Sequence, residues 1–408
     1  MAAELTKGAL SGIRVADFSW VWAGPYCTAL LGFLGAEVIK IESRKRVDQT
    51  RKGSIMNGDN FEGVDSSPTF NNANLNKKGV SIDISIPEGQ ELARQLVAKS
   101  DVVVANMRPG KMDKLHLGYA DLKKVKPDII MIESTGFGAT GPFKGFAGYA
   151  PIFASMGGLC NLTGYADGAP NPMSGVQDLR VGTQSAFAVL AALIYRQKTG
   201  KGMYIDCSSS ECITTLLGTE MMDYTMNRRV AKRMGNADPY MAPHGVYRAK
   251  GDDKWVSIAC GTEEEWKSFV GVMGNPEWAS DPKFASMYDR KKNEAELNAR
   301  ISEWTINYTH EEVMNMCQAA GVAAMPSWCA EEILNNEHIK ARNVVTSVEH
   351  PLLKTQYVLN PAWKLSETPA TIRKPGPCLG EDNMDVFTNL LGYTPEQVNE
   401  MIEKHWLY

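Results

Sequence analysis

Residues 12–43, GIRVADFSWVWAGPYCTALLGFLGAEVIKIES, decide the fold that the sequence predicts. Apolar and β-branched residues predict one strand over 13–18 and a second strand over 38–41. Between these strands, Pro25 in the first turn and Gly35 at the end delimit a helix. This order of elements is a βαβ unit, whose two strands lie parallel in one sheet.

The same alternation continues to about residue 220. Strands are predicted at VSIDIS, DVVVAN, DIIMIES and MYIDC, and helices at 87–98, around 113–124 and from Asp178 to Gly200. A further helix begins with a capping box, Ser208 to Glu211. Val/Ile-rich strands that alternate with helices predict an α/β fold with a Rossmann-like, doubly wound parallel sheet. Ligands of such sheets bind beyond the carboxyl ends of the strands.

The character of the sequence changes after Tyr224. The next hundred residues combine a polar segment with short strands and amphipathic helices, which predicts a smaller α+β domain. The proline-punctuated remainder is expected to return to the large domain. We therefore expect three parts, with the boundaries 1–224, 225–330 and 331–408.

The composition argues against several classes of protein. The 408 residues carry a net charge of −4, so nucleic acid is not an expected partner. No apolar run reaches the roughly 20 residues of a membrane span, and the first ten residues lack the apolar core of a signal peptide, so no membrane association and a cytoplasmic location are expected. Eight scattered cysteines form no CxxC, and six dispersed histidines show no metal-ligand spacing. We expect reduced thiols and no metal site.

Two further segments contain residues that could bind a cofactor or act as nucleophiles. Glu42 ends the second strand, where a dinucleotide-binding fold holds a ribose, but the turn WVWAGP lacks GxGxxG, which argues against a dehydrogenase. The segment IDCSSSEC offers Cys207, Cys212 and three serines as nucleophiles. Helix capping by Ser208 and Glu211 explains that segment without catalysis.

Asp178 stands where a polar loop gives way to a long helix. An aspartate at a helix start is most often a cap. The free N–H groups there also favour an ionised carboxylate, and they could stabilise an oxyanion that forms beside it. The local sequence leaves the cap and the catalytic residue as open alternatives.

Many separated motifs resemble those of the family III CoA-transferases, the group of formyl-CoA transferase and the carnitine enzyme. The resemblance covers nearly the whole chain. It implies an interlocked, ring-like dimer of two-domain chains with Asp178 as the catalytic residue. The motifs are VWAGPYCTALLGFLGAEVIKIES, DQTR, NLNKKGVSIDI, ANMRPG, SGVQD and LAALIYRQKTGKGMYID.

The resemblance implies a reaction in which the Asp178 carboxylate attacks an acyl-CoA thioester to form a mixed anhydride. The released CoA thiolate then forms an aspartyl-CoA thioester, from which a carboxylic acid acceptor takes the CoA through a second anhydride. CoA thioesters are thus substrates, and no permanently bound cofactor is expected. The resemblance and the neighbouring sequence place the following residues around CoA: Val21, Trp22 and Ala23 near the thiol; Lys77, Lys114, Arg51 and Arg108 at the phosphates; Asn106 and Met107 at the adenine; Thr135 and Phe137 in the loop after the fifth strand.

The substrate is expected to differ from that of formyl-CoA transferase, which carries Lys and Tyr where this chain has Thr135 and Phe137. The aromatic residues Trp20, Trp22 and Tyr149 near the site favour a bulkier acceptor than oxalate. The overall similarity is greatest to the benzylsuccinate CoA-transferases of anaerobic aromatic degradation. It implies succinyl-CoA as the donor and benzylsuccinate as the acceptor.

Several alternatives stay open. Arg180 or Arg108 is the candidate for binding the distal carboxylate of a dicarboxylic acceptor. The partner chain is either identical, giving a homodimer, or a related subunit in a heterodimer or heterotetramer. One rival function is an acyl-CoA racemase of the same fold, which would need a histidine beside the substrate. The other is a non-catalytic CoA-binding partner subunit, against which the presence of Asp178 argues.

Overall fold

The computed structural model describes residues 8–52, 63–173 and 175–408. The chain forms two compact units, which are described separately here. The larger unit runs to Cys160 and also contains Pro172–Val230 and Lys340–Tyr408. The smaller unit contains Asn161–Asn171 and Ala231–Ile339. Each unit therefore combines segments that are distant in the sequence.

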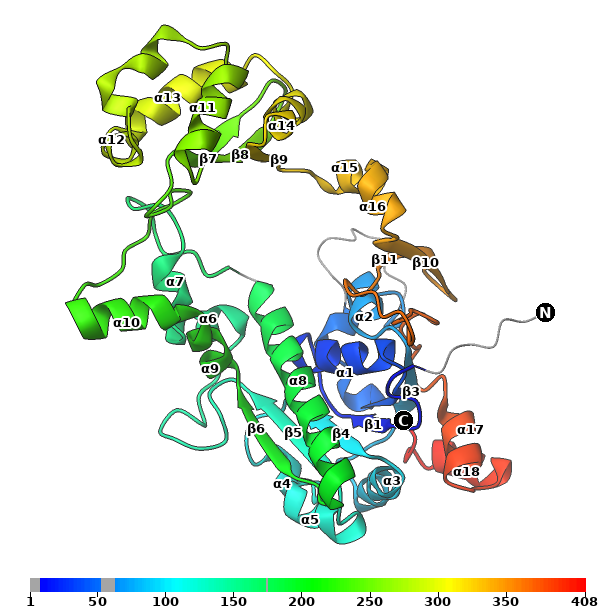
Figure 1. Cartoon of the computed structure of the whole chain (residues 1–408). Helices are drawn as coiled ribbons and strands as arrows, with labels where there is room; N and C mark the ends of the chain where they lie inside the picture. Colours follow the sequence, from blue (N-terminus) through cyan, green and yellow to red (C-terminus); the bar gives the residue numbers. More distant parts are fainter. Residues whose placement is uncertain (1–7, 53–62, 174) are drawn as a thin grey trace. The chain divides into compact units, whose positions relative to one another are not determined.

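A six-stranded parallel sheet forms the centre of the larger unit (Figure 1). Its strand order is β3-β2-β1-β4-β5-β6, the order of a dinucleotide-binding fold. This arrangement confirms the predicted doubly wound sheet. The order reverses between β1 and β4, where Val15 lies opposite Val102. The strands are β1 (Arg14–Asp17), β2 (Glu37–Glu42), β3 (Lys77–Ser81), β4 (Val102–Ala105), β5 (Ile130–Thr135) and β6 (Tyr204–Ser208).

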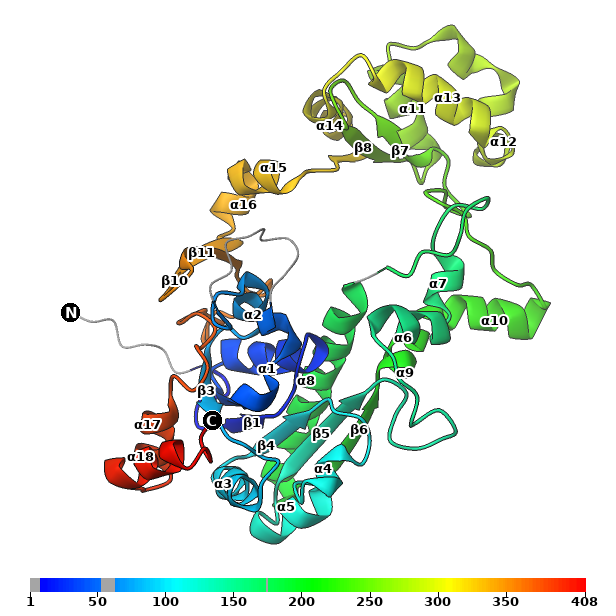
Figure 2. The same cartoon turned by 180° about the vertical axis from the view of Figure 1, so that it is seen from behind.

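Two apolar cores form because the central strands are buried on both faces. One core joins the sheet to α1 (Ala23–Phe33) and α8 (Val176–Thr199). The other joins it to α3 (Pro87–Ala98), α5 (Tyr119–Val125) and α18 (Pro395–Glu403). Figure 2 shows the sheet from behind. The remaining helices of the larger unit are α2 (Pro68–Ala73), α4 (Lys111–Lys114), α6 (Ala150–Met156), α9 (Ser209–Thr214), α10 (Gly218–Asn227) and α17 (Asn383–Asp385).

The single helix predicted around 113–124 is wrong, because two short helices, α4 and α5, occupy this stretch. The chain turns between them at His116, whose backbone is left-handed with φ 54°. Gly118 follows, and its Cα lies so close to the Asp113 side chain that a Cβ would clash. The left-handed conformation of His116 and the close approach of Gly118 to Asp113 end the helix, although the apolar pattern alone predicts that it continues.

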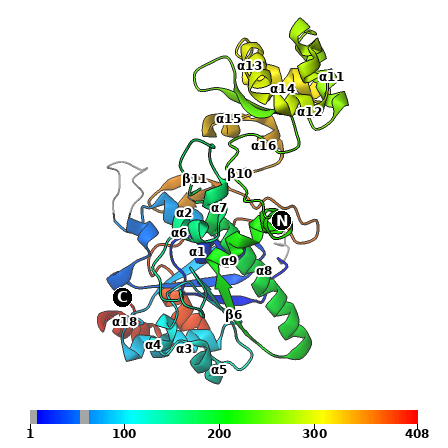
Figure 3. The ribbon, with the colours of Figure 1, turned by 90° about the vertical axis from the view of Figure 1, so that its left-hand side faces the viewer.

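The smaller unit contains an antiparallel sheet of three strands in the order β7-β8-β9. Figure 3 shows the helices of this unit beside the sheet. The helices and the sheet share one apolar core, which includes Phe269, Phe284 and Ile301. The strands are β7 (His244–Arg248), β8 (Trp255–Ala259) and β9 (Ala323–Pro326), and the helices are α11 (Glu263–Val272), α12 (Met287–Lys292), α13 (Glu294–Thr305) and α14 (His310–Ala319).

Further elements connect and complete the two units. A hairpin of β10 (Val345–His350) and β11 (Lys354–Leu359) contributes Val348 and Val358 to the core beside α1. The short helices α7 (Leu159–Leu162), α15 (Ala330–Asn335) and α16 (Glu337–Ala341) lie near the unit boundaries in the sequence. Of the helices that the structure describes, none has both the length and the apolar character needed to cross a membrane.

Candidate active site

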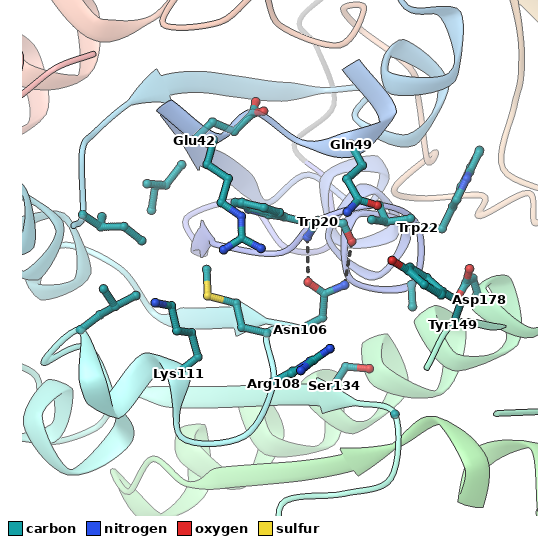
Figure 4. Close-up of a pocket in the computed structure, with 18 of the residues that line it drawn as sticks. Trp20, Trp22, Glu42, Gln49, Asn106, Arg108, Lys111, Ser134, Tyr149 and Asp178 are labelled. Carbon is teal, nitrogen blue, oxygen red and sulfur yellow. Dashed lines mark hydrogen bonds between the residues drawn. The ribbon is translucent and has the colours of Figure 1, made fainter. Parts of the chain in front are cut away.

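A cavity of about 770 Å³ lies within the larger unit, beyond the carboxyl ends of its strands (Figure 4). It spans the point between β1 and β4 where the strand order reverses, the usual ligand position in this fold. The loops after β1, β2, β3, β4 and β5 line it, together with α6, α8 and α9. Its lining includes Trp20, Val21, Trp22, Ala23, Lys45, Arg46, Gln49, Asn106, Met107, Arg108, Lys111, Ser134, Tyr149, Phe153, Asp178 and Ser209.

The loop after β1 crosses the point where the strand order reverses. A side chain from the loop after β4 holds it there with two hydrogen bonds. The Trp20 N–H donates to Asn106 Oδ1 at 2.7 Å, and Asn106 Nδ2 donates to the Trp20 carbonyl at 2.7 Å (Figure 4). A side-chain amide that makes both bonds satisfies both polar groups of residue 20. The loop is therefore fixed by side chains instead of by the glycines of a GxGxxG turn.

Asp178 lies in the first turn of α8 and lines the cavity. Gly175, with φ 96°, holds the N-cap position, and no side chain caps this helix. Within the described residues, the Asp178 carboxylate has no hydrogen-bond partner. Burial raises its pKa to about 6. Among the residues that the structure describes, Asp178 thus caps no helix and presents its carboxylate to the cavity.

Close packing of α8 on α1 brings Asp178 to the loop after β1. Gly182, one turn beyond Asp178, faces the start of α1. A Cβ at this position would lie 2.7 Å from the Ala23 carbonyl oxygen and 2.9 Å from the Tyr26 ring. Only glycine lets the two helices approach so closely. The carboxylate therefore shares one cavity with Trp22 and Ala23.

Cationic side chains gather on the wall formed by the loops after β2 and β4. Arg46 stacks on the Trp20 ring, 4.7 Å from its centroid, and Lys45 pairs with Asp83 at 2.6 Å. The side chains of Arg108 and Lys111 have no ion-pair or hydrogen-bond partner in the described part of the chain. This wall suits an anionic ligand such as a nucleotide phosphate.

Seven of the residues predicted for the site line the cavity: Val21, Trp22, Ala23, Asn106, Met107, Arg108 and Asp178. Lys77 and Arg51 do not line it, although they were predicted at the phosphates. Lys77 is fully buried and binds Asp17 at 3.0 Å. Arg51 is also buried and pairs with Glu42 at 2.8 Å. Both cations neutralise buried carboxylates, so we assign them to the scaffold.

The other predicted residues also lie outside the cavity lining. Lys114 is exposed on α4, three residues beyond Lys111. Thr135 is buried at the end of β5, and Phe137 packs edge-on against Phe153 with ring centroids 5.5 Å apart. Phe137 therefore supports an aromatic wall that Phe153 presents to the cavity.

Sequence reasoning missed most of the cationic wall. The sequence feature that could have indicated this wall is the run Arg44–Arg46, which lies directly after the second predicted strand, where ligand-binding loops begin. The sequence could not distinguish Lys111 from its neighbour Lys114, because both lie on α4 and only the structure shows which of them lines the cavity. Phe153 was missed because it lies on α6, an element that the sequence pattern did not predict.

The structure gives less support to the alternatives, which are a ribose site at Glu42, nucleophiles in the segment IDCSSSEC and a racemase. Arg51 binds Glu42 through Nε and Nη2, so this carboxylate is not free to hold a ribose. Cys207 and Cys212 lie with their sulfurs 3.7 Å apart, and Ser208 caps α9 by accepting from the Glu211 N–H. No histidine belongs to the lining of the cavity within the described residues.

One cluster with metal-ligand chemistry occurs among the described residues, in the smaller unit. His310 Nε2 lies 3.1 Å from a carboxylate oxygen of Glu311 and 3.1 Å from one of Glu332. Lys254 also pairs with Glu332 at 2.6 Å. The lysine therefore already supplies positive charge to this cluster.

Comparison with known families identifies this arrangement. The model of CoA-transferase family III matches residues 10–383, which include every residue of the cavity. The chain belongs to family III of the CoA-transferases. It is therefore an enzyme that transfers CoA, and CoA thioesters are its substrates.

Relatives of this CoA-transferase align along nearly their full length. A succinyl-CoA–L-malate CoA-transferase beta subunit from Chloroflexus aurantiacus is 34% identical, with 97% of each chain covered. A succinyl-CoA–D-citramalate CoA-transferase from the same organism is 33% identical, with 98% of each chain covered. The crystal structure of a CAIB/BAIF family protein from Brucella suis superposes with a TM-score of 0.86 at 32% identity, covering 94% of this chain and 100% of that one.

Proposed function

We propose that this enzyme transfers CoA from succinyl-CoA to a dicarboxylic acid, with Asp178 as the nucleophile. The observation that carries the proposal is the Asp178 carboxylate, which has no hydrogen-bond partner among the described residues, in a cavity with a cationic wall. The names of the two Chloroflexus relatives support succinyl-CoA as the donor and a dicarboxylic acid as the acceptor.

In this proposal the first step converts the thioester of succinyl-CoA into a mixed anhydride, which is also an activated acyl group. A carboxylate oxygen of Asp178 attacks the thioester carbonyl, the C–S bond breaks, and CoA leaves as a thiolate. The thiolate attacks the aspartyl carbonyl of the resulting anhydride, which releases succinate and leaves an aspartyl-CoA thioester. Asp178 needs no general base, because a carboxylate with a pKa of about 6 is largely ionised at neutral pH.

The second half of the reaction repeats these steps with the acceptor. Its carboxylate attacks the aspartyl thioester to give a new anhydride and CoA thiolate. The thiolate then attacks the acceptor's carbonyl, which forms the new acyl-CoA and regenerates Asp178. Each intermediate is open to hydrolysis, so the reaction requires that water be excluded from Asp178 once the substrate fills the cavity that Trp22 and Tyr149 line.

The cavity favours transfer over racemisation. A racemase needs an acid/base group at the substrate α-carbon, and no histidine is among the described residues that line this cavity. The cations instead support a substrate with several negative charges. In our assignment Lys45, Arg46 and Lys111 bind the nucleotide end of CoA, and Arg108 binds the distal carboxylate of the acceptor.

The acceptor that we propose is a substituted succinate, with benzylsuccinate as the representative. Trp22, Tyr149 and Phe153 line the same cavity as Asp178, and their aromatic surface suits an apolar substituent. Arg108 supplies the charge for the second carboxylate. A panel of malate, citramalate, glutarate and benzylsuccinate, compared by kcat/KM with succinyl-CoA, tests this choice. Higher kcat/KM for the small acids would contradict the aromatic acceptor but not CoA transfer.

The experiment that tests the nucleophile is mass spectrometry of the enzyme incubated with succinyl-CoA and then treated with borohydride or hydroxylamine. We expect a modification that maps to Asp178 and is absent from Asp178→Asn. Asp178→Asn that still forms the adduct, or wild type that forms none with any acyl-CoA donor, would overturn the proposal. Thr183→Ala, on the exposed side of the same helix, is the control and should be modified like wild type.

We also propose that a second chain, identical or a related subunit, covers exposed apolar side chains on α8 and α10. Phe187 and Met226 are each 74% exposed, and Met222 is 61% exposed. Surfaces of this kind mark protein interfaces, and the L-malate relative is itself a subunit. Light scattering should show a dimer or larger assembly that Phe187→Glu weakens. A monomer at micromolar concentration would contradict this.

A further inference from the structure

Val21 has a backbone conformation that its side chain disfavours. Its φ is 67°, in the left-handed region, which is a genuine outlier for a β-branched residue. Such strain persists only where the surroundings impose it. Val21 stands between Trp20 and Trp22, and all three line the cavity.

A buried carboxylate binds the backbone N–H of Val21. Asp48 accepts the Val21 N–H with Oδ1 at 3.1 Å and Oδ2 at 3.2 Å. The Thr50 N–H and hydroxyl also donate to Asp48 Oδ1, which fixes the orientation of the carboxylate. Both Asp48 and its ion-pair partner Lys40 have fully buried side chains, with 3.2 Å between Lys40 Nζ and Asp48 Oδ2.

Lys40 extends the same support to Ser19, two residues before Val21, because its Nζ also donates to the Ser19 carbonyl. The charges keep each other ionised. Lys40 lowers the pKa of Asp48 against the effect of burial, and Asp48 raises the pKa of Lys40. The backbone of the loop is thus held by a buried ion pair on one side and by Asn106 on the other.

We propose that Asp48, paired with Lys40, is a positioning residue for CoA binding that holds Val21 in its left-handed conformation. This conformation aims Trp20 and Trp22 into the cavity, although Asp48 itself is absent from the lining. The inference rests on the proposed function in one respect, that the cavity binds CoA. In dinucleotide-binding folds glycines form the tight turn at this position, whereas here the ion pair of Asp48 and Lys40 would hold a turn that carries bulky side chains.

The experiment measures binding of free CoA to the intact enzyme by calorimetry, and KM and kcat with succinyl-CoA. Asp48→Ala should weaken CoA binding and raise KM roughly tenfold, as expected for loss of a hydrogen bond to a charged group, with a smaller change in kcat. Asp48→Asn, which keeps an acceptor, should have a smaller effect. Asp101→Asn removes an ion pair with Arg196 outside the cavity lining and should leave CoA binding unchanged.

A double-mutant cycle separates positioning from general damage to the fold. Glycine adopts a positive φ without strain, so the loss caused by Asp48→Ala should be much smaller in a Val21→Gly background. Equal losses in the two backgrounds would overturn the proposal, as would wild-type CoA affinity in Asp48→Ala. If Asp48→Ala does not fold, the same cycle is made with Asp48→Asn. Wild type that binds no CoA would instead refute the proposed function.

Discussion

The guanidinium of Arg46 lies over the ring of Trp20, 4.7 Å from its centroid, at the wall of the cavity. Under the proposed function, this stack offers an aromatic surface on which the adenine of CoA can stack. Trp20→Ala should raise KM for succinyl-CoA roughly tenfold, the usual effect of losing a base-stacking partner. Arg46→Ala should have a smaller effect of the same sign.

The control for this stack is a truncated substrate. Succinyl-pantetheine lacks the nucleotide, so Trp20→Ala should leave its kcat/KM close to that of wild type. An equal loss with both thioesters would show that Trp20 does not act on the nucleotide.

The pH dependence of the reaction should follow the Asp178 carboxylate. Its pKa, raised by burial to about 6, means that the nucleophile becomes protonated below that pH. We expect kcat/KM to fall about tenfold per pH unit below about pH 6 and to level off above about pH 7. A profile of kcat/KM that is flat between about pH 5 and pH 7 would contradict an ionised Asp178 as the nucleophile.

The same pKa predicts a change in stability. The folded state holds the Asp178 proton more tightly than the unfolded chain, where the pKa is near 3.8. The stability that protonation provides is complete below about pH 4 and is lost as the pH rises through about 6. Asp178→Asn should therefore have a higher Tm than wild type at pH 7.5, by a few degrees, and a similar Tm at pH 4. Scanning calorimetry at both pH values measures this, and a lower Tm of Asp178→Asn at pH 7.5 would contradict it.

Lys77 should matter for folding more than for phosphate binding. Lys77→Met leaves Asp17 buried without its ion-pair partner, which should lower the free energy of unfolding by about 3–5 kcal/mol. Asp17→Asn together with Lys77→Met should recover much of this loss, because no lone charge stays buried. Urea unfolding measures both. Lys111→Met is the matched comparison, and it should raise KM for succinyl-CoA with little effect on unfolding.

Arg108 and Arg180 should differ in their effects on the acceptor. Arg108 lines the cavity, whereas Arg180 lies outside its lining, beside the Gln184 amide. Arg108→Leu should raise KM for a dicarboxylic acceptor tenfold or more, by loss of a charge-assisted contact of roughly 1.5–3 kcal/mol. Arg180→Leu should leave it unchanged. An equal effect of Arg108→Leu on a monocarboxylic acceptor would place this arginine at CoA.

The sequence by itself determined the doubly wound sheet and the family. Val/Ile-rich strands alternate with helices at a spacing that few folds satisfy, and burial on both faces of the sheet requires that composition. The sequence also predicts Asp178 and the segment Val21–Ala23 as site residues, through motifs that resemble those of the family, and these residues line the cavity.

Only the tertiary structure decided which charged side chains line the cavity. Lys77 and Lys111 are both lysines near predicted loops, yet one is buried against Asp17 and the other lines the cavity. The sequence shows the charge of each residue but not the buried carboxylate that neutralises it. The pairing of Asp48 with Val21 joins residues 27 positions apart, and it exists because parallel strands bring their carboxyl ends to one edge of the sheet.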